Sequence, residues 1–288
     1  MISTESPEAK TLKKIESLKN LISIPKIILE VNQHLSSDPG NMVKLGKLIS
    51  RDQGLTTKVV AVANSPLYGL QRKVTSIEFA LMIMGTDEIQ RIVTAVSLSD
   101  SLKFNSSENF NYLDYWKHSM VVGAAAKDIS IRLGFSDLSG EAFLAGMLHD
   151  VGMQIIAQYF PSEYVAIIEA SKNGKKFFDA EKEILGIGHD FIGRELSLKW
   201  KLPDSISEAI EHHHLPSSSP NHKVLSSIVH LADSMTQEFH VGDCFWDKQI
   251  NFDIEVVELL KFKSAELMSH FVGDYNEIFT DTAETINL

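Results

Sequence analysis

An adjacent histidine and aspartate, His149 and Asp150, lie inside an apolar run from Glu141 to Phe160, whose pattern predicts one helix. Together the two residues offer an imidazole nitrogen and a carboxylate to a single cation. Burying both polar groups costs free energy unless a metal ion or a hydrogen-bond network satisfies them. The pair is therefore where the sequence first indicates chemistry.

Other residues of ligand type follow at intervals of 31 residues (118 to 149), 40 (149 to 189), 24 (189 to 213) and 20 (213 to 233). These are helix-plus-loop distances, so several helices of a bundle could each direct one side chain to a common centre. Imidazole and carboxylate ligands together suit iron, manganese, nickel or zinc better than calcium or magnesium. Such a site can acidify a bound water for phosphoester hydrolysis. The candidate ligands are His118, His149, Asp150, His189, the run His212-His213-His214, and Asp233.

A purely structural interpretation stands beside this one. The histidine run alone could be a solvated helix end, where a positive charge favours the helix dipole. Isolated histidines are more often hydrogen-bonded core or surface residues than metal ligands, and we interpret His34, His222, His230, His240 and His270 in that way. The whole set of candidates favours a metal site over the structural interpretation.

Composition narrows the class of protein. The chain has 288 residues, of which 44% are hydrophobic and 23% charged, and its net charge of −11 would repel a nucleic-acid backbone. Its single cysteine, Cys244, excludes an internal disulfide and fits a reducing compartment. The polar start lacks the apolar core of a secretion signal, and no uncharged apolar run approaches the roughly 20 residues of a membrane helix. We expect a soluble cytoplasmic protein with no nucleic-acid or membrane partner.

Helical periodicity covers nearly the whole chain and strand signals are nearly absent, so we predict an all-α, multi-helical fold. The polar segment at 103–111 is the best internal boundary, although it is short enough to be only a loop. As a boundary it divides an N-terminal helical subdomain, 1–105, from a second subdomain, 106–288. We expect the end of the chain to be frayed. The predicted helices are 8–23, 26–34, 42–50, 55–64, 77–84, 87–98, 112–133, 141–160, 161–171, 177–185, 189–200, 204–212, 224–239 and 253–273.

The order of candidate ligands resembles the HD superfamily of metal-dependent phosphohydrolases, most closely its HD-GYP branch. The wider sequence resembles the HDOD domain, the HD-related output domain of bacterial signalling proteins, over roughly residues 15–235. The matching segments are Ile24-Pro25, Asp52 with Leu55-Thr56, Val62-Ala63-Asn64-Ser65-Pro66, Ser76-Ile77 through Met84-Gly85, Trp116-Lys117-His118-Ser119, Gly146 through Gly152, Glu183 with Leu185-Gly186-Ile187-Gly188-His189, Trp200-Lys201-Leu202-Pro203, and Ala209-Ile210.

The resemblance implies an HD-domain-like helical bundle packed against an N-terminal helical subdomain, and a role in signal transduction. His118, His149, Asp150 and Asp233 match the basic HD ligand set. His189, His213 and His214 match the ligands that support a second metal in the HD-GYP branch, and Asp150 could bridge the two ions. The spacing from Ile210 to Pro216 favours His213 and His214 over His212.

Two departures argue against turnover, and HDOD proteins as a class are thought not to be active phosphohydrolases. Leu215-Pro216-Ser217 replaces the Gly-Tyr-Pro of the HD-GYP branch, and Met153 replaces a lysine that often contacts phosphate. We therefore expect a non-catalytic signalling output module that binds a partner protein or a nucleotide-like ligand, with one or two transition-metal ions. We assign no catalytic residue and no other cofactor.

The alternative is a metal-dependent phosphohydrolase or phosphodiesterase acting on nucleotides or cyclic dinucleotides. Such an enzyme needs basic groups for phosphate, and the basic residues nearest to the candidate ligands in sequence are Lys117, Lys127, Arg132 and Arg194.

Overall fold

The structure is a computed structural model that describes residues 5–19, 22–106, 109–241, 246 and 252–285. Within these ranges the chain forms helices and turns without an extended strand, which confirms the predicted all-α fold. The helices before residue 101 are α1 (Pro7–Lys19), α2 (Lys26–Ser37), α3 (Met42–Ile49), α4 (Gln53–Ala63), α5 (Ile77–Met84) and α6 (Thr86–Asp100), with the 3₁₀ turn η1 (Pro66–Tyr68).

The helices that follow carry the candidate ligands. They are α7 (Tyr112–Arg132), α8 (Ser139–Leu148), α9 (Val151–Tyr159), α10 (Pro161–Lys172), α11 (Phe177–Leu185), α12 (His189–Lys199), α13 (Asp204–Glu211), α14 (Lys223–Glu238), α15 (Val256–Leu259), α16 (Ala265–Gly273) and α17 (Asn276–Thr285), with the 3₁₀ turns η2 (Ser136–Leu138) and η3 (Pro216–Ser218). No helix in the described ranges has both the length and the apolar character needed to cross a membrane.

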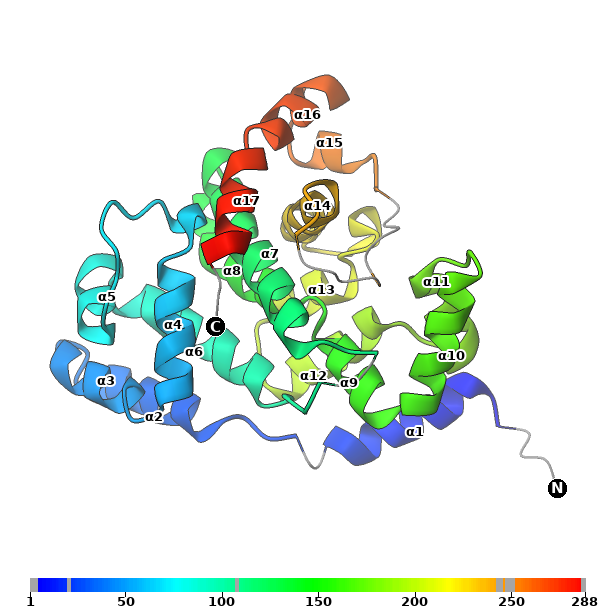
Figure 1. Cartoon of the computed structure of the whole chain (residues 1–288), viewed down its shortest axis with the longest axis horizontal. Helices are drawn as coiled ribbons and strands as arrows, with labels where there is room; N and C mark the ends of the chain where they lie inside the picture. The colour runs from blue at the N-terminus through cyan, green and yellow to red at the C-terminus, as the bar shows by residue number, and fades with distance from the viewer. Residues whose placement is uncertain (1–4, 20–21, 107–108, 242–245, 247–251, 286–288) are drawn as a thin grey trace.

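The antiparallel pair α7 and α8 runs through the middle of the molecule, with α2 to α6 gathered on one side and α9 to α12 on the other (Figure 1). Helix α6 packs against both α4 and α8, so it joins the first group to the centre. The central pair approaches closely because two glycines face each other. A Cβ added at Gly146 would lie only 2.8 Å from the Cα of Gly123.

The predicted helix 141–160 is wrong, because the structure breaks it between Leu148 and Val151. Asp150 leaves the helical conformation, with φ −96° and ψ 13°. Every residue from Ala142 to Ile156 is buried, so no amphipathic period marks the break. The break matters because it re-aims the carboxylate of Asp150 relative to His149.

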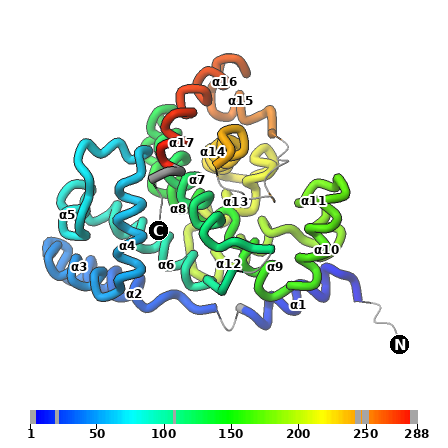
Figure 2. Tube along the Cα trace, viewed as in Figure 1, coloured from blue at the N-terminus to red at the C-terminus, as the bar shows by residue number. Residues whose placement is uncertain are grey.

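The C-terminal prediction also needs correction. The expected helix 253–273 is two helices, α15 and α16, separated by a turn in which Lys261 has φ +62°. The end of the chain is not frayed through residue 285 but forms α17, which packs on α7 and η1 (Figure 2). Tyr275 and Phe279 are fully buried there, and the Tyr275 hydroxyl donates to Asp128 on α7 at 2.7 Å. Burial of aromatic side chains thus holds a segment whose sequence pattern is weak.

Candidate metal centre

Four side chains meet in the interior where α7, the α8–α9 junction and α14 cross. We call them the inner cluster: His118 Nε2, His149 Nε2, Asp150 Oδ2 and Asp233 Oδ1. The two imidazole nitrogens are 3.2 Å apart. Each of them lies 3.5 Å from Asp150 Oδ2 and 3.4 Å from Asp233 Oδ1. All four side chains are at most 1% exposed.

A second group lies on the other side of Asp150. We call it the outer cluster: the Nε2 atoms of His189, His213 and His214, together with Asp150 Oδ1. His189 Nε2 is 3.4 Å from His213 Nε2 and 2.9 Å from His214 Nε2. Asp150 Oδ1 lies 3.2 Å from His189 Nε2 and 3.7 Å from His213 Nε2. One carboxylate therefore faces both groups, each with a different oxygen.

The structure thus brings all seven candidate ligands of the sequence prediction into one centre. It separates them from His212, the other member of the histidine run. The His212 ring contacts the Ser218 hydroxyl at 2.9 Å and lies 3.7 Å from Glu211.

The meeting of α9 and α12 depends on Gly152, two residues after Asp150. A Cβ at Gly152 would lie 2.0 Å from the carbonyl oxygen of His189, far inside contact distance. Any side chain would therefore push α12 away from α9. The glycine of the His-Asp-Val-Gly segment is explained by this approach, which brings His189 within reach of Asp150.

Backbone carbonyl groups behind two of the rings set the tautomer that a metal ligand needs. The Nδ1 atoms of His149 and His213 lie 2.7 Å and 2.6 Å from the carbonyl oxygens of Gly146 and Ile210, three residues earlier in each case. A carbonyl only accepts, so these Nδ1 atoms carry the proton and each Nε2 presents its lone pair to the centre.

His189 is held by a carboxylate that the sequence analysis missed. Glu181 Oε2, on α11, accepts from both the backbone N–H of His189, at 3.0 Å, and its Nδ1, at 2.7 Å. Glu181 is fully buried. The sequence did contain a signal for it: Glu181 lies four residues from both Phe177 and Leu185, on the apolar face of α11, where an acidic side chain is unexpected.

A second supporting residue is His230, which the sequence analysis treated as structural. Its Nδ1 donates to the carbonyl oxygen of His213 at 2.6 Å, and its Nε2 accepts from the backbone N–H of Asp253 at 3.0 Å. Asp253 in turn accepts from the N–H of Ser217 at 2.9 Å. His230 therefore ties the backbone of the histidine run to the segment before α15.

The charges of the centre are set by burial and by close partners of opposite sign. Burial raises the pKa of a carboxyl group, yet the imidazoles around Asp150 and Asp233 outweigh this and hold both pKa values well below the usual range. Burial lowers the pKa of His149, but the charges of Asp150 and Asp233 raise it above its ordinary value. Both aspartates are thus anionic in the buried site.

The three imidazoles of the outer cluster differ in the direction of their pKa shifts. Burial, followed by the neighbouring imidazoles, lowers the pKa of His213 to about 3 and that of His214 well below its ordinary value. Burial acts in the same direction on His189, but Glu181 and Asp150 outweigh it and raise the pKa of His189. Neutral imidazoles such as those of His213 and His214 have a lone pair available for a metal ion.

Three observations test whether these residues fit a metal ion. A ligand–metal distance of about 2.0–2.1 Å implies ligand–ligand distances of about 3.3–3.4 Å in a tetrahedron and about 2.9 Å at right angles. The five distances given for the inner cluster run from 3.2 to 3.5 Å, and those of the outer cluster from 2.9 to 3.7 Å. Asp150 Oδ1 and both oxygens of Asp233 are buried without a hydrogen-bond donor among the described residues. The donor set also suits a transition metal.

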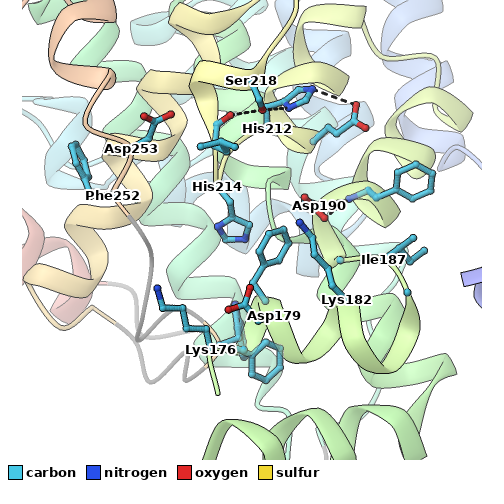
Figure 3. A pocket seen from close by; sticks show the side chains of 18 of the residues that line it. Lys176, Asp179, Lys182, Ile187, Asp190, His212, His214, Ser218, Phe252 and Asp253 are labelled. Carbon is cyan, nitrogen blue, oxygen red and sulfur yellow. Dashed lines mark hydrogen bonds and ion pairs between the residues drawn. The ribbon is translucent and has the colours of Figure 1, made fainter. Parts of the chain in front are cut away.

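A cavity of about 770 Å³ adjoins the outer cluster (Figure 3). Of the seven candidate ligands, His214 alone is among the residues that line it. Its lysines are Lys176, the residue before α11, and Lys182 within that helix, and aromatic rings such as Phe178 and Phe191 also line it. The four basic residues nearest to the candidate ligands in sequence do not line this cavity, because residues close in sequence to a ligand need not face the same cavity in the fold. They are Lys117, Lys127, Arg132 and Arg194.

Comparison with known proteins identifies a family and solved structures with a similar fold. A model of the HDOD domain family matches residues 21–216. The fold is similar to that of an HDOD domain protein of unknown function from Geobacter sulfurreducens, with a TM-score of 0.76 and 24% identity over 97% of this chain and 99% of that one. It is also similar to a proposed phosphohydrolase from Shewanella amazonensis, with a TM-score of 0.73 and 21% identity over 97% of this chain and 99% of that one.

Among curated proteins, an uncharacterized protein of Treponema pallidum is 23% identical over 231 residues, which is 79% of this chain. The matched part is 44% of that relative, so the chain spans less than half of its length. At these identities, the solved structures support the shared fold and nothing finer.

Proposed function

The chain belongs to the HDOD domain family, and we propose that it is a signalling output module whose helical core binds two divalent transition-metal ions, one in each cluster. The role in signalling is what the family suggests, with the input coming from a partner protein. The metal ions would be iron, manganese, nickel or zinc, because the ligands are imidazoles and carboxylates.

One observation carries the proposal. Asp150 directs its two oxygens to two separate sets of ligand atoms, and each set has the ligand–ligand spacing of a coordination shell. A hydrogen-bonded core would instead pair the buried oxygens of Asp233, which have no donor among the described residues. Bound metal ions would neutralise two buried carboxylates and stabilise the folded state by mass action.

A second candidate function is hydrolysis of a phosphoester in a nucleotide or cyclic dinucleotide. The observation that favours it is the cavity beside His214, whose volume of about 770 Å³ suits a small-molecule ligand. Lys176 and Lys182 offer positive charge to a phosphate group there, opposed by four carboxylates of the same lining, Asp179, Asp190, Glu211 and Asp253. When bound, paired metal ions supply Lewis acidity and a hydroxide nucleophile. The protein residues would hold the phosphate and position the ions.

Two features rank hydrolysis second. The ligands of the inner cluster are sealed from solvent, and only the outer cluster reaches the cavity through His214. Met153, which occupies the place of the lysine in the resemblance, is fully buried in the core and cannot contact a phosphate in the cavity.

Elemental analysis of untagged protein purified without chelator tests the metal proposal. We expect about two equivalents of transition metal in the natural chain and less than about half an equivalent in Asp150→Asn, which keeps the shape of the side chain but removes its charge. Asp190→Asn is the matched control, since Asp190 lines the cavity but lies in neither cluster. Folded protein that remains metal-free after incubation with zinc, manganese or iron(II) would contradict the proposal.

A screen of cyclic and linear nucleotides on metal-loaded protein separates the two functions. The output-module proposal expects binding without product. Release of phosphate or a linear nucleotide that is lost in Asp150→Asn, and reduced in Lys176→Ala with Lys182→Ala, would establish hydrolysis instead.

A further inference from the structure

Trp246 lies between the cavity and the metal centre, 30 residues beyond the end of the family match at residue 216. Its ring lines the cavity, and on its other side the indole Nε1–H donates to Asp150 Oδ2 at 2.7 Å. The side chain is 7% exposed. Trp246 therefore both lines the cavity and contacts Asp150, the carboxylate shared by the two clusters.

The ring is fixed by packing as well as by its hydrogen bond. It stacks on Phe110, with ring centroids 5.7 Å apart and planes only 6° from parallel. Phe110 is itself fully buried and packs against Tyr115 and Tyr164. Stacking sets the plane of the indole, so the N–H has one direction and points to Asp150.

The hydrogen bond bears on how Asp150 is shared. A carboxylate oxygen has two lone-pair directions, so Oδ2 can accept from the indole with one and face the inner cluster with the other. Losing the indole donor would leave the carboxylate free to rotate about its Cβ–Cγ bond. Rotation would bring both oxygens toward one cluster and leave the other cluster short of a ligand.

We propose that Trp246 is a positioning residue for Asp150 and also the partition that separates the cavity from the inner cluster. This inference rests on the proposed metal binding. The indole N–H holds the carboxylate in its shared orientation, and the ring blocks passage from the cavity. A small anion in the cavity then meets the outer cluster through His214 but does not reach the inner ion.

Two variants separate the two roles. Trp246→Phe keeps an aromatic ring for stacking and partition but removes the donor. Trp246→Ala removes both the aromatic ring and the hydrogen-bond donor. Trp200→Phe is the matched control, because Trp200 is 4% exposed and follows the last turn of α12, at the opposite end from His189.

The first measurement is zinc affinity, by competition with a chromophoric chelator, alongside the melting temperature of the metal-free protein. Outer partners of metal ligands typically affect affinity by about 10–100-fold. We expect Trp246→Phe to weaken at least one site by that factor while the metal-free melting temperature stays near that of Trp200→Phe. Affinity unchanged in Trp246→Phe, or a loss equal to that in Trp200→Phe, would overturn the positioning role.

The second measurement is the rate at which zinc is released to an excess of pyridine-2,6-dicarboxylate, a planar dianion small enough for the cavity. We expect release of the slower ion to be at least about tenfold faster in Trp246→Ala than in Trp246→Phe, since only the alanine opens the partition. Equal rates would overturn the partition. A natural chain that binds none of zinc, manganese or iron(II) would overturn the proposed function, and this inference with it. Tight binding with unaffected variants overturns this inference alone.

Discussion

The inner and outer clusters share one carboxylate but sit in different surroundings. All side chains of the inner cluster are sealed in the core, on α7, the α8–α9 junction and α14. The outer cluster includes His214, which is half-buried and lines the cavity. The inner cluster also has the narrower range of ligand–ligand distances. We infer that an inner ion serves mainly as a structural element, while an outer ion is the one that a solute or partner could contact.

Removing a ligand from each cluster gives the largest expected difference. His118→Ala should lower inner-site affinity by more than about 100-fold, and His214→Ala should do the same for the outer site only. Zinc titration with calorimetry should therefore show one remaining equivalent in each variant. Exposed His270 provides the control variant His270→Ala. If either ligand variant lost both ions, or neither, the two clusters would not be separate sites.

We also expect metal binding at the inner cluster to stabilise the fold more than metal binding at the outer cluster. Metal at about 100 times its dissociation constant contributes about 2.7 kcal/mol of unfolding free energy, or roughly 5–10 °C in melting temperature for a chain of this size. We expect His118→Ala to abolish most of the metal-dependent rise in melting temperature and His214→Ala to keep most of it. Differential scanning calorimetry with and without EDTA measures this. The reverse order would show that the exposed cluster is the structural one.

The outer cluster can be weakened without touching a ligand. Glu181→Gln removes the charge that orients His189, so we expect outer-site affinity to fall by about 10–100-fold while the inner site is unchanged. Glu183→Gln is the matched control, because Glu183 lies two residues along the same helix with its side chain 67% exposed. Equal effects of the two variants in the same zinc titration would show that His189 does not depend on Glu181.

The smallest effect concerns the loop after the histidine run. Glu208, on α13, accepts from the Ser219 hydroxyl and from the backbone N–H groups of Asn221 and His222. Burial raises the pKa of Glu208, but these hydrogen bonds outweigh burial and lower the pKa to about 2. Because the folded pKa lies below the unfolded value of about 4.5, the stabilisation is present above pH 4.5 and is lost as pH falls toward 2.

Glu208→Gln should therefore lower the free energy of unfolding by about 1 kcal/mol at pH 7, after allowing for the partial exposure of the group. The difference from the natural chain should shrink as pH falls from 4.5 toward 2. Urea unfolding of metal-free protein at several pH values measures this, with affinity for zinc unchanged at pH 7. A difference that stays constant with pH would mean that the ionised carboxylate is not the stabilising group.

Local signals explain why the helices could be predicted. Asn111 caps α7, Ser76 caps α5 and Pro161 opens α10, and each acts within a few residues of itself. The ligand types and their helix-plus-loop spacing are likewise written along the chain. Where burial is uniform, as from residue 142 to 156, periodicity contains no information about a break.

The sequence by itself determined an all-helical chain and the candidate ligand residues. Only the tertiary structure decided that Asp150 faces two clusters, that Glu181 holds His189, that Trp246 holds Asp150, and which basic residues line the cavity. Trp246 and Asp150 are 96 residues apart in the chain. Capping and periodicity act over one or two turns, whereas a site assembled from distant segments depends on how the helices pack, which no local pattern records.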